Sequence, residues 1–324
     1  IIADGLLSYH EIGHEGADDH HILSLFQKTT LQAGKHVNLR ATQEANDTYL
    51  VLQGTKISAG GDISVATNHH LLLDVGVDNQ YDYHKSVHKH GKIKRKTTIT
   101  ETVNEFSDAN VSQLTGKNIN LQVNGKPLHH LNIYGADLVA AGGNISLRSS
   151  GDIGLYAVKN QHNSQINSQT KKRFAGIRYD TTRVNHSRRQ MTVLPAELNA
   201  KYIHIKSEGD TTLEGTRFHY LQGAKIEAGA KLNILPVSNI LYEQQNKDSN
   251  YVVWQKIQNK GQITQTAQLP SFTGNSRPEF YAKGGIHVQI PVTEKDAQKR
   301  TLKENILELG KIPEYSYLNE LAQN

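Results

Sequence analysis

The 324-residue chain predicts an all-β fold: a right-handed parallel β-helix with protruding β-hairpins and a short helical C-terminal tail. Three observations predict this fold. A short motif of small residues, glycine and alternating apolar residues recurs along the chain, its apolar anchors return at intervals of 82 to 84 residues, and polar segments separate pairs of motifs. Self-similarity at a fixed period is typical of chains that stack one small structural unit on the next.

The short motif predicts a strand that begins at a sharp corner. Residues 57–65 read ISAGGDISV and residues 138–147 read LVAAGGNISL, with further copies at 33–39, 226–234 and 282–288. The alternation of apolar and polar residues indicates a strand with one face turned inward. Glycine, asparagine and aspartate tolerate the left-handed backbone angles of a tight corner. Since such short strands cannot each bury an apolar face alone, we expect successive coils to stack.

The long period sets the domain organisation. The anchors Val37, Ile119, Ile203 and Ile286 are 82, 84 and 83 residues apart. Each long unit contains two motif copies and then a polar excursion. We therefore expect a β-helix over residues 31–291, in which the residues outside the excursions form about seven coils of roughly 20 residues each. Residues 1–30 are interpreted as the end of a preceding excursion or coil, and residues 292–324 as a helical segment that leads to a C-terminal effector region.

The excursions at 76–110, 157–197 and 239–279 are interpreted as hairpins that leave the stack and return. The first is expected to turn at residues 90–92 and to return through the β-branched segment 96–102. The third is expected to run outward at 251–254, turn at 259–261 and return at 263–266. The second has the same character over 174–182 but shows no clear tip.

After Pro291 the pattern becomes helical. Leu302, Ile306 and Leu309 recur at the spacing of one helix face. Gly310 is a typical stop signal, and a second short helix is expected to begin at Tyr317. This tail is expected to belong to a different module.

Composition excludes several classes of protein. Lys and Arg number 36 against 31 Asp and Glu, which gives a net charge of only +5, and apolar residues make up 36% of the chain, as a narrow core would require. No apolar stretch is long enough for a membrane-spanning helix. The absence of cysteine excludes disulfides, thiol nucleophiles and thiolate metal sites. Since Ile1 and Ile2 follow no initiator methionine or signal peptide, we expect a piece of a longer polypeptide whose export signal lies upstream.

The motif at residues 57–65 and its copies resemble the hemagglutinin repeats of filamentous hemagglutinin and of the CdiA-type exoproteins of contact-dependent growth inhibition. The excursions, rich in Tyr, Lys and Thr, are similar to the second, C-terminal repeat region of those proteins. The tail at 302–321 is similar to the segment that follows this region and leads into the toxin-carrying end.

This resemblance implies a non-enzymatic segment of a secreted protein displayed on the bacterial surface. It implies export through an outer-membrane transporter of two-partner secretion, contact with the outer membrane or a surface receptor of a target cell, and delivery of a C-terminal toxin across that membrane. Two alternatives stay open. One is a polysaccharide-active β-helix enzyme, and the other is a passive stalk of a filamentous adhesin.

Basic and aromatic residues of the excursions are the candidate contacts with a membrane or receptor. The first excursion has no acidic residue between His84 and Thr100, and a second basic group follows at 171–173. Such a patch attracts phosphate or lipopolysaccharide, although lysines also protect hairpin edges from pairing. Tyr251 and Trp254 could stack on a sugar, enter a membrane interface or pack on the rod. The candidates are Lys85, Lys89, Lys92, Lys94, Arg95, Lys96, Lys171, Lys172, Arg173, Tyr251 and Trp254.

No catalytic residue, metal ion, cofactor or nucleic-acid partner is expected. The histidine pairs at 20–21, 69–70 and 129–130 are interpreted as surface residues, because neighbours on a strand point to opposite faces and cannot easily chelate one ion. Asp62, Asp152 and Asp210 follow glycine at corners, so turn chemistry is favoured over the paired carboxylates of a glycan-cleaving site. Aromatic residues are too sparsely interleaved with basic ones to indicate nucleic-acid binding, and no known nucleic-acid-binding motif occurs.

Overall fold

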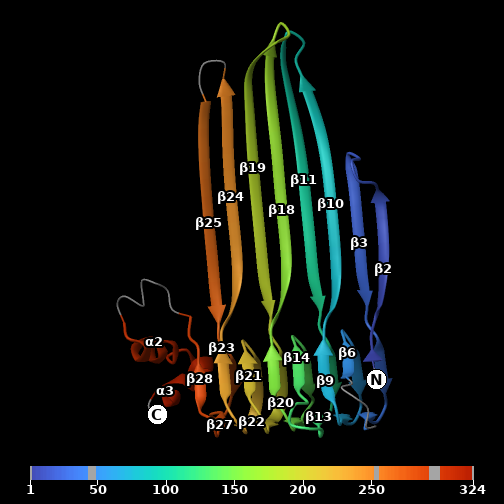
Figure 1. Ribbon diagram of the computed structural model, residues 1–324, viewed down its shortest axis with the longest axis vertical. Coiled ribbons are helices and arrows are strands. Elements are labelled where there is room, and N and C mark those ends of the chain that lie inside the picture. The colour runs from blue at the N-terminus through green and yellow to red at the C-terminus, as the bar shows by residue number, and fades with distance from the viewer. Residues whose placement is uncertain (1, 43–48, 252–254, 292–299, 323–324) are drawn as a thin grey trace.

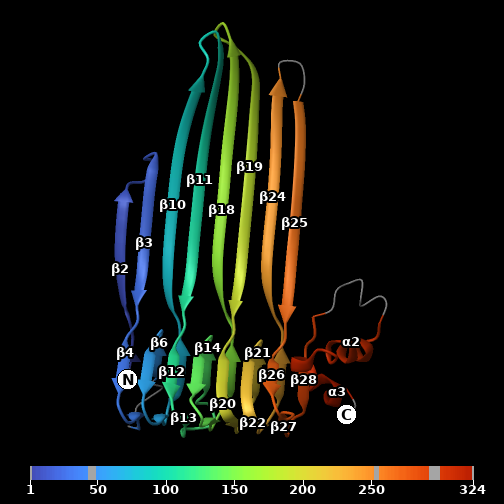
Figure 2. The same cartoon turned by 180° about the vertical axis from the view of Figure 1, so that it is seen from behind.

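The computed structural model describes residues 2–42, 49–251, 255–291 and 300–322, which form a parallel β-helix with a sheet of hairpins standing on it (Figures 1 and 2). The rod has three faces of parallel strands, and over these residues the chain passes seven times through the first, second and third face in turn. The predicted β-helix is thus confirmed, with the expected number of coils.

The strands of the rod are short because each ends at a corner. The first face holds β4 (Thr30–Ala33), β7 (Lys56–Ala59), β12 (Gln113–Gly116), β15 (Asp137–Ala140), the first halves of β20 (Glu197–Ser207) and β22 (Arg217–Ala228), and β26 (Ser271–Gly274). The second face holds β5 (Val37–Ala41), β8 (Ile63–Thr67), β13 (Ile119–Val123), β16 (Asn144–Ser149), the second halves of β20 and β22, and β27 (Glu279–Ala282). The third face holds β1 (Ile2–Ala3), β6 (Tyr49–Gln53), β9 (His70–Asp74), β14 (Leu131–Tyr134), β17 (Ile153–Tyr156), β21 (Thr211–Glu214), β23 (Leu232–Leu235) and β28 (Ile286–Val288).

Apolar ladders inside the rod form the core. On the second face Ile63 pairs with Ile119, Ile119 with Ile145 and Ile145 with Ile203, and all four side chains are 0 or 1% exposed. Stacking like residues at the strand spacing of about 4.8 Å keeps each coil's inward side chains in contact with those of the next. Val37 and Ala224 extend this ladder by one coil at either end.

One of the predicted anchors, Ile286, lies on a different face from the others. It pairs with Leu232 on the third face, whereas Ile203 is followed on the second face by Ala224. The reason is that the glycine-rich corner motif precedes strands of both faces, so equal spacing in the sequence does not fix the face.

In the described part of the chain, four hairpins leave the rod, each between the third and the first face. Their strands are β2 (Leu6–Gly13) with β3 (Asp19–Gln27), β10 (Gly76–His90) with β11 (Lys94–Asn110), β18 (Val158–Phe174) with β19 (Ile177–Leu194), and β24 (Val237–Tyr251) with β25 (Gln255–Gln268). Residues 1–30 therefore contain β1 and a complete hairpin. Figure 1 shows the strands of the second and third hairpins reaching farthest from the rod.

The hairpins join edge to edge into one antiparallel sheet of eight strands, here called the hairpin sheet. The joining pairs are β3 with β10, β11 with β18, and β19 with β24. After the first hairpin, each new one leaves the rod after two further coils. Two coils rise by about twice 4.8 Å, which is also the width of a two-stranded hairpin, so neighbouring hairpins meet at hydrogen-bonding distance. The sequence pattern did not predict this joining.

At coils without a hairpin, a glycine turns the chain directly from the third to the first face. Gly54, Gly135 and Gly215 occupy this corner with φ values of 51°, 58° and 58°. A Cβ at Gly135 would lie 2.7 Å from Val158, and one at Gly215 would lie 2.3 Å from Val237. Both valines begin a hairpin, so the bare glycine corner leaves room for the hairpin root that packs over it.

Of the two predicted tips, one agrees with the structure and one is wrong, and the excursion without a clear predicted tip has a well-defined turn. The β10–β11 hairpin turns at Gly91, with φ +84°, and the β18–β19 hairpin turns at Ala175 and Gly176, with φ of 44° and 86°, as a type I′ turn requires. In the β24–β25 hairpin, residues 259–261 pair with 244–246 in the middle of the strands, so the predicted tip is wrong. Val237 pairs with Gln268 at the root, and the ladder continues without a break to the pair of Asn250 and Gln255.

The tail packs against the last coil. It contains α2 (Leu302–Leu309), the 3₁₀ helix η1 (Pro313–Tyr315) and α3 (Leu318–Leu321), and α2 begins with a capping box between Thr301 and Glu304. Tyr317 and Leu318 are buried with the apolar core, so the tail covers the end of the rod rather than forming a separate module. Leu302 is 63% exposed and does not share the packed stripe of Ile306 and Leu309. None of the helices in the described residues is both long and apolar enough to cross a membrane.

Candidate functional site at the free end of the hairpin sheet

The joining of β11 to β18 brings the two basic excursions together. Arg95 pairs directly with Arg173 and Lys96 with Lys172, while Lys171 pairs with Thr97. We call the resulting group the cationic end. It consists of Lys89, Lys92, Lys94, Arg95, Lys96, Lys171, Lys172, Arg173 and Arg178.

The cationic end is poorly compensated by acidic groups. Like charges directly opposite each other on neighbouring strands destabilise a sheet. Within the described residues, Asp180 is the one carboxylate within 4 Å of these cations, at 2.7 Å from the Nζ atom of Lys172. A hydrogen bond to this buried carboxylate raises the pKa of Lys172. In the part of the chain that the structure describes, the other cations have no such partner, so their positive electrostatic potential extends into the solvent and attracts an anionic partner.

Successive side chains of a strand point to opposite faces, so both faces of the sheet carry charge near its tip. Arg95 and Arg173 lie on one face, and Lys96 and Lys172 lie on the other. The side chains of Lys94, Arg95 and Arg173 are exposed. An anionic layer that met the end of the sheet would therefore contact cations on both sides.

Three exposed apolar side chains lie at the tip among these cations. Ile93 is 69% exposed, Phe174 is 52% exposed and Ile177 is 74% exposed. Phe174 pairs with Ile177 across the turn and with Lys94 on the neighbouring hairpin. The amide of Ala175 donates to the carbonyl oxygen of Ile93 at 3.1 Å, which holds the two turns together.

Sequence reasoning did not single out Ile93, Phe174 and Ile177. The available signal was the presence of large apolar residues in turn positions, where burial in the rod is impossible. Their proximity became visible only once the two hairpins were known to pair.

The other predicted contact residues lie elsewhere. Lys85 lies toward the rod from the cationic end, with its Nζ atom 3.7 Å from Glu101. Tyr251 ends β24 and pairs with Asp180 of β19. Trp254 lies outside the described residues.

The corner aspartates form ladders between coils. The carboxylate of Asp152 accepts the backbone N–H of Asp210 at 2.8 Å, and the carboxylate of Asp210 accepts that of Lys231 at 2.8 Å. At the other corner, Asp62 accepts from the side chain of Asn118, which in turn accepts the backbone N–H of Asn144. Turn chemistry is confirmed for these three aspartates, since each carboxylate satisfies a donor of a neighbouring coil.

Several histidines are buried, contrary to the expectation of surface positions. His69 and His129 are 6% and 5% exposed, and their rings lie 5.5 Å apart. The Nδ1 atom of His70 lies 3.1 Å from the backbone N–H of His130 and accepts from it. These side chains act as corner rungs, as the aspartates do. Among the described residues, no group of three or more His, Asp or Glu side chains is arranged to hold a metal ion.

A parallel rod built from similar units, each of two coils and a hairpin, is a repeat protein. The family model of the hemagglutinin repeat matches residues 26–106 and 93–252 of this chain. These matches cover more than two thirds of the chain, which therefore belongs to the hemagglutinin repeat family. It is accordingly a repeat segment of a secreted, adhesin-type surface protein. No curated protein and no solved structure matches the chain.

Proposed function

We propose that this segment is a contact region of its exoprotein, and that the free end of the hairpin sheet docks on the outer membrane of a neighbouring cell. The observation that supports the proposal most strongly is the apolar tip of Ile93, Phe174 and Ile177 surrounded by the cationic end. Apolar side chains next to Lys and Arg are typical of elements that insert shallowly at a lipid surface.

The two kinds of side chain contribute by different mechanisms. Each Lys or Arg near an anionic surface contributes about 1 kcal/mol of attraction, which salt weakens. Burying an apolar side chain adds about 1.5 to 3 kcal/mol, which salt does not weaken. Phosphate groups of the outer leaflet supply the anionic surface in this proposal.

The length of the hairpins gives the tip its reach. The strands β10, β11, β18 and β19 have 15, 17, 17 and 18 residues. At about 3.3 Å per residue they extend roughly 50 to 60 Å, beyond the neighbouring hairpins (Figure 1). The membrane-contacting groups thus lie far from the rod.

The biological role that we infer is the delivery of a C-terminal toxin across the outer membrane of the target cell, after export through a two-partner secretion transporter. The resemblance to contact-dependent growth inhibition exoproteins and the exposed tip support this role. A sheet anchored on the membrane would hold the rod, and whatever is joined to it, next to the target.

Binding of the purified chain to outer-membrane vesicles tests the proposal. One variant changes Ile93, Phe174 and Ile177 to Ser, and another changes Lys94, Arg95 and Lys96 to Glu. A control changes Lys256 and Lys260 of β25, outside the cationic end, to Glu. We expect saturable binding of the wild type and the control, and at least tenfold weaker binding, about 1.4 kcal/mol, for both tip variants.

Equal binding of all four proteins, or no binding of the wild type, would show that the hairpin tips do not contact the membrane. A passive stalk would then explain the fold. Circular dichroism of each variant, with an unchanged β-sheet signal, keeps a binding defect separate from unfolding.

A further inference from the structure

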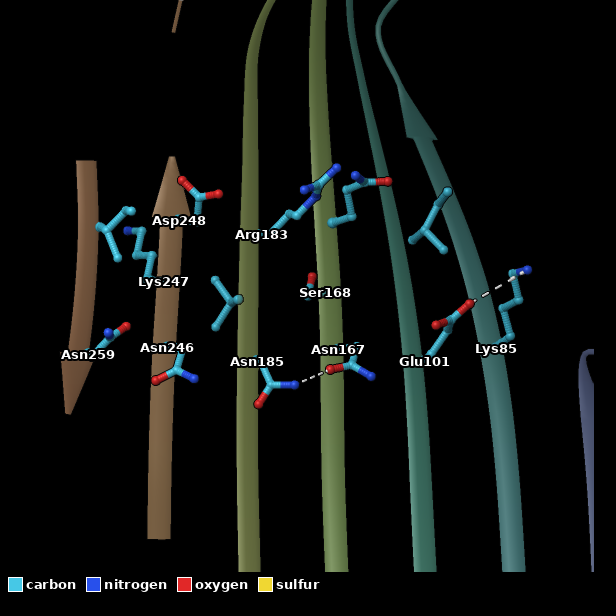
Figure 3. Close-up of a pocket in the computed structure, with 14 residues that line it drawn as sticks. Lys85, Glu101, Asn167, Ser168, Arg183, Asn185, Asn246, Lys247, Asp248 and Asn259 are labelled. Carbon is cyan, nitrogen blue, oxygen red and sulfur yellow. Dashed lines mark hydrogen bonds and ion pairs between the residues drawn. The ribbon is translucent and has the colours of Figure 1, made fainter. Parts of the chain in front are cut away.

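A shallow trough crosses one face of the hairpin sheet between its tip and the rod. It consists of two adjacent cavities of about 480 and 490 Å³. The first extends from Lys85 on β10 to Asn259 on β25, across six strands (Figure 3). The second, lined by Gln165 and Tyr242 among others, lies next to it on the rod side.

A row of amides forms the floor of the first cavity. Asn167 pairs with Asn185, Asn185 with Asn246, and Asn246 with Asn259, so the four lie side by side on consecutive strands (Figure 3). The side-chain amide of Asn185 donates to the carbonyl oxygen of Asn167 at 2.5 Å. The spacing of the row is that of the strands, about 4.8 Å.

Hydrogen bonds within the sheet use only part of what these amides offer. Gln165 donates to the carbonyl oxygen of Asn167 at 3.3 Å, and Gln244 donates to that of Asn246 at 3.2 Å. An amide group carries two donors and an acceptor with two lone pairs. Among the described residues, the side-chain NH₂ groups of Asn167 and Asn246 therefore stay available to a ligand.

Charges around the first cavity largely compensate one another. Glu101 lies 3.7 Å from Lys85, and Arg183 is directly opposite Asp248. This balance contrasts with the cationic end, and it favours a ligand without net charge. A neutral ligand that both donates and accepts hydrogen bonds, and that repeats along its length, matches a row of amides.

Gly261 separates the two cavities at the outer strand. It lies on the same face as Asn259 of the first cavity and Ile263 of the second. A Cβ at Gly261 would find its nearest neighbour at 3.7 Å, an ordinary contact, and its φ is not among the positive values. Neither packing nor backbone conformation requires glycine here. Glycine within a strand commonly marks a place where a ligand approaches closely.

We propose that this trough binds a neutral, linear oligosaccharide laid across the strands. The amide row would bind the sugar hydroxyls, which both donate and accept, and Tyr242 and Ile263 would contact the ring faces. The absence of a side chain at Gly261 would let the chain of sugars pass over the outer strand. This site is separate from the membrane-contacting tip and does not depend on it.

The test is binding to immobilised cellohexaose, maltohexaose and N-acetylchitohexaose. A double variant, Asn185→Ala with Asn246→Ala, removes two central amides. The variant Gly261→Val fills the gap, and its β-branched side chain should leave the melting temperature equal or higher. The matched control is His186→Ala with Gln245→Ala, which changes adjacent residues of the same strands on the opposite face.

We expect the wild type and the control to bind at least one of these sugars, with no loss between about 0.15 M and about 0.5 M salt. Both trough variants should bind at least about tenfold more weakly. The proposal is overturned if the wild type binds none of the three, if the control loses as much affinity, or if Gly261→Val binds as well as the wild type. The variant with Lys94→Glu, Arg95→Glu and Lys96→Glu should bind the sugar as well as the wild type does. This result would distinguish sugar binding in the trough from membrane docking by the tip.

Discussion

The phenolic O–H of Tyr317 donates to the carbonyl oxygen of Pro270 across 2.7 Å, from a side chain that is 3% exposed. Its ring also contacts Phe272 with the ring centroids 5.0 Å apart. One residue of the tail is thus hydrogen-bonded to the segment that leads into the last coil. The end of the rod, where apolar side chains would otherwise meet water, is covered by this contact.

The first prediction concerns this contact. Tyr317→Phe keeps the ring but leaves the buried carbonyl of Pro270 without its donor, which should lower the free energy of unfolding by about 1 to 3 kcal/mol. Urea unfolding followed by circular dichroism measures the change. The control Tyr281→Phe alters a side chain that is 55% exposed and should have little effect. Equal stability of Tyr317→Phe and the wild type would mean that the hydrogen bond does not secure the tail.

The second prediction concerns the glycine corners. Gly135→Ala should be more destabilising than Gly142→Ala. Both glycines have positive φ, at 58° and 75°, so alanine costs about 1 to 2 kcal/mol at either position. Only at Gly135 does a Cβ also collide with Val158, while nothing lies within 4 Å at Gly142. Melting temperatures of the two variants measure the difference, and equal losses would contradict the packing of the hairpin root on this corner.

The third prediction concerns the apolar ladder. Ile145→Ala should cost about 2 to 5 kcal/mol, because a side chain that is 0% exposed would leave a cavity between Ile119 and Ile203. Ile257→Ala removes the same atoms from a side chain that is 63% exposed on β25 and should cost far less. The denaturant concentrations at which half of each variant is unfolded measure this difference in stability. Similar losses would be incompatible with a core confined to the rod.

The fourth prediction concerns pH. Burial raises the pKa of Asp137 above its usual range, with Glu197 opposite it adding a repulsive charge. A raised pKa means that the folded state holds the proton longer than the unfolded state does, so stability falls as the pH rises from the unfolded pKa of about 3.9 through the folded value. Asp137→Asn should therefore raise the melting temperature at about pH 7, where the carboxylate is charged.

The same substitution should bring little gain at about pH 3, where Asp137 is protonated in both states. Thermal unfolding of the two proteins at both pH values provides the comparison. A gain of equal size at low pH would show that the effect is one of packing rather than of charge.

The sequence predicted the rod well because its signals are local. Alternation such as Ile63, Ser64 and Val65 reports directly on which side chains point inward, and the glycine pairs mark the corners. The β24–β25 hairpin shows the limit of local signals. An Asn-Lys-Gly segment at 259–261 favours a turn, but pairing from the root at Val237 and Gln268 determines where the turn falls.

The candidate site was less accessible from sequence. The basic residues of each excursion were evident, yet Arg95 and Arg173 are 78 positions apart in the sequence, and only the joining of hairpins places them opposite each other. The amide row has the same origin, since Asn167, Asn185, Asn246 and Asn259 come from two hairpins. Which residues of different hairpins become neighbours depends on the distance that the rod rises between successive hairpins. No short segment of the sequence encodes that distance.

The departure of hairpins after every second coil restricts how such a protein can lengthen in evolution. An insertion of one coil would shift all later hairpins by a single strand spacing, about 4.8 Å. The hairpin sheet would then contain a gap one strand wide, with unpaired strand edges on both sides. A duplication of two coils with their hairpin would extend both layers without a mismatch. The gene is thus expected to gain or lose segments in units of the 82 to 84 residue period, and related chains of different length should differ by whole multiples of it.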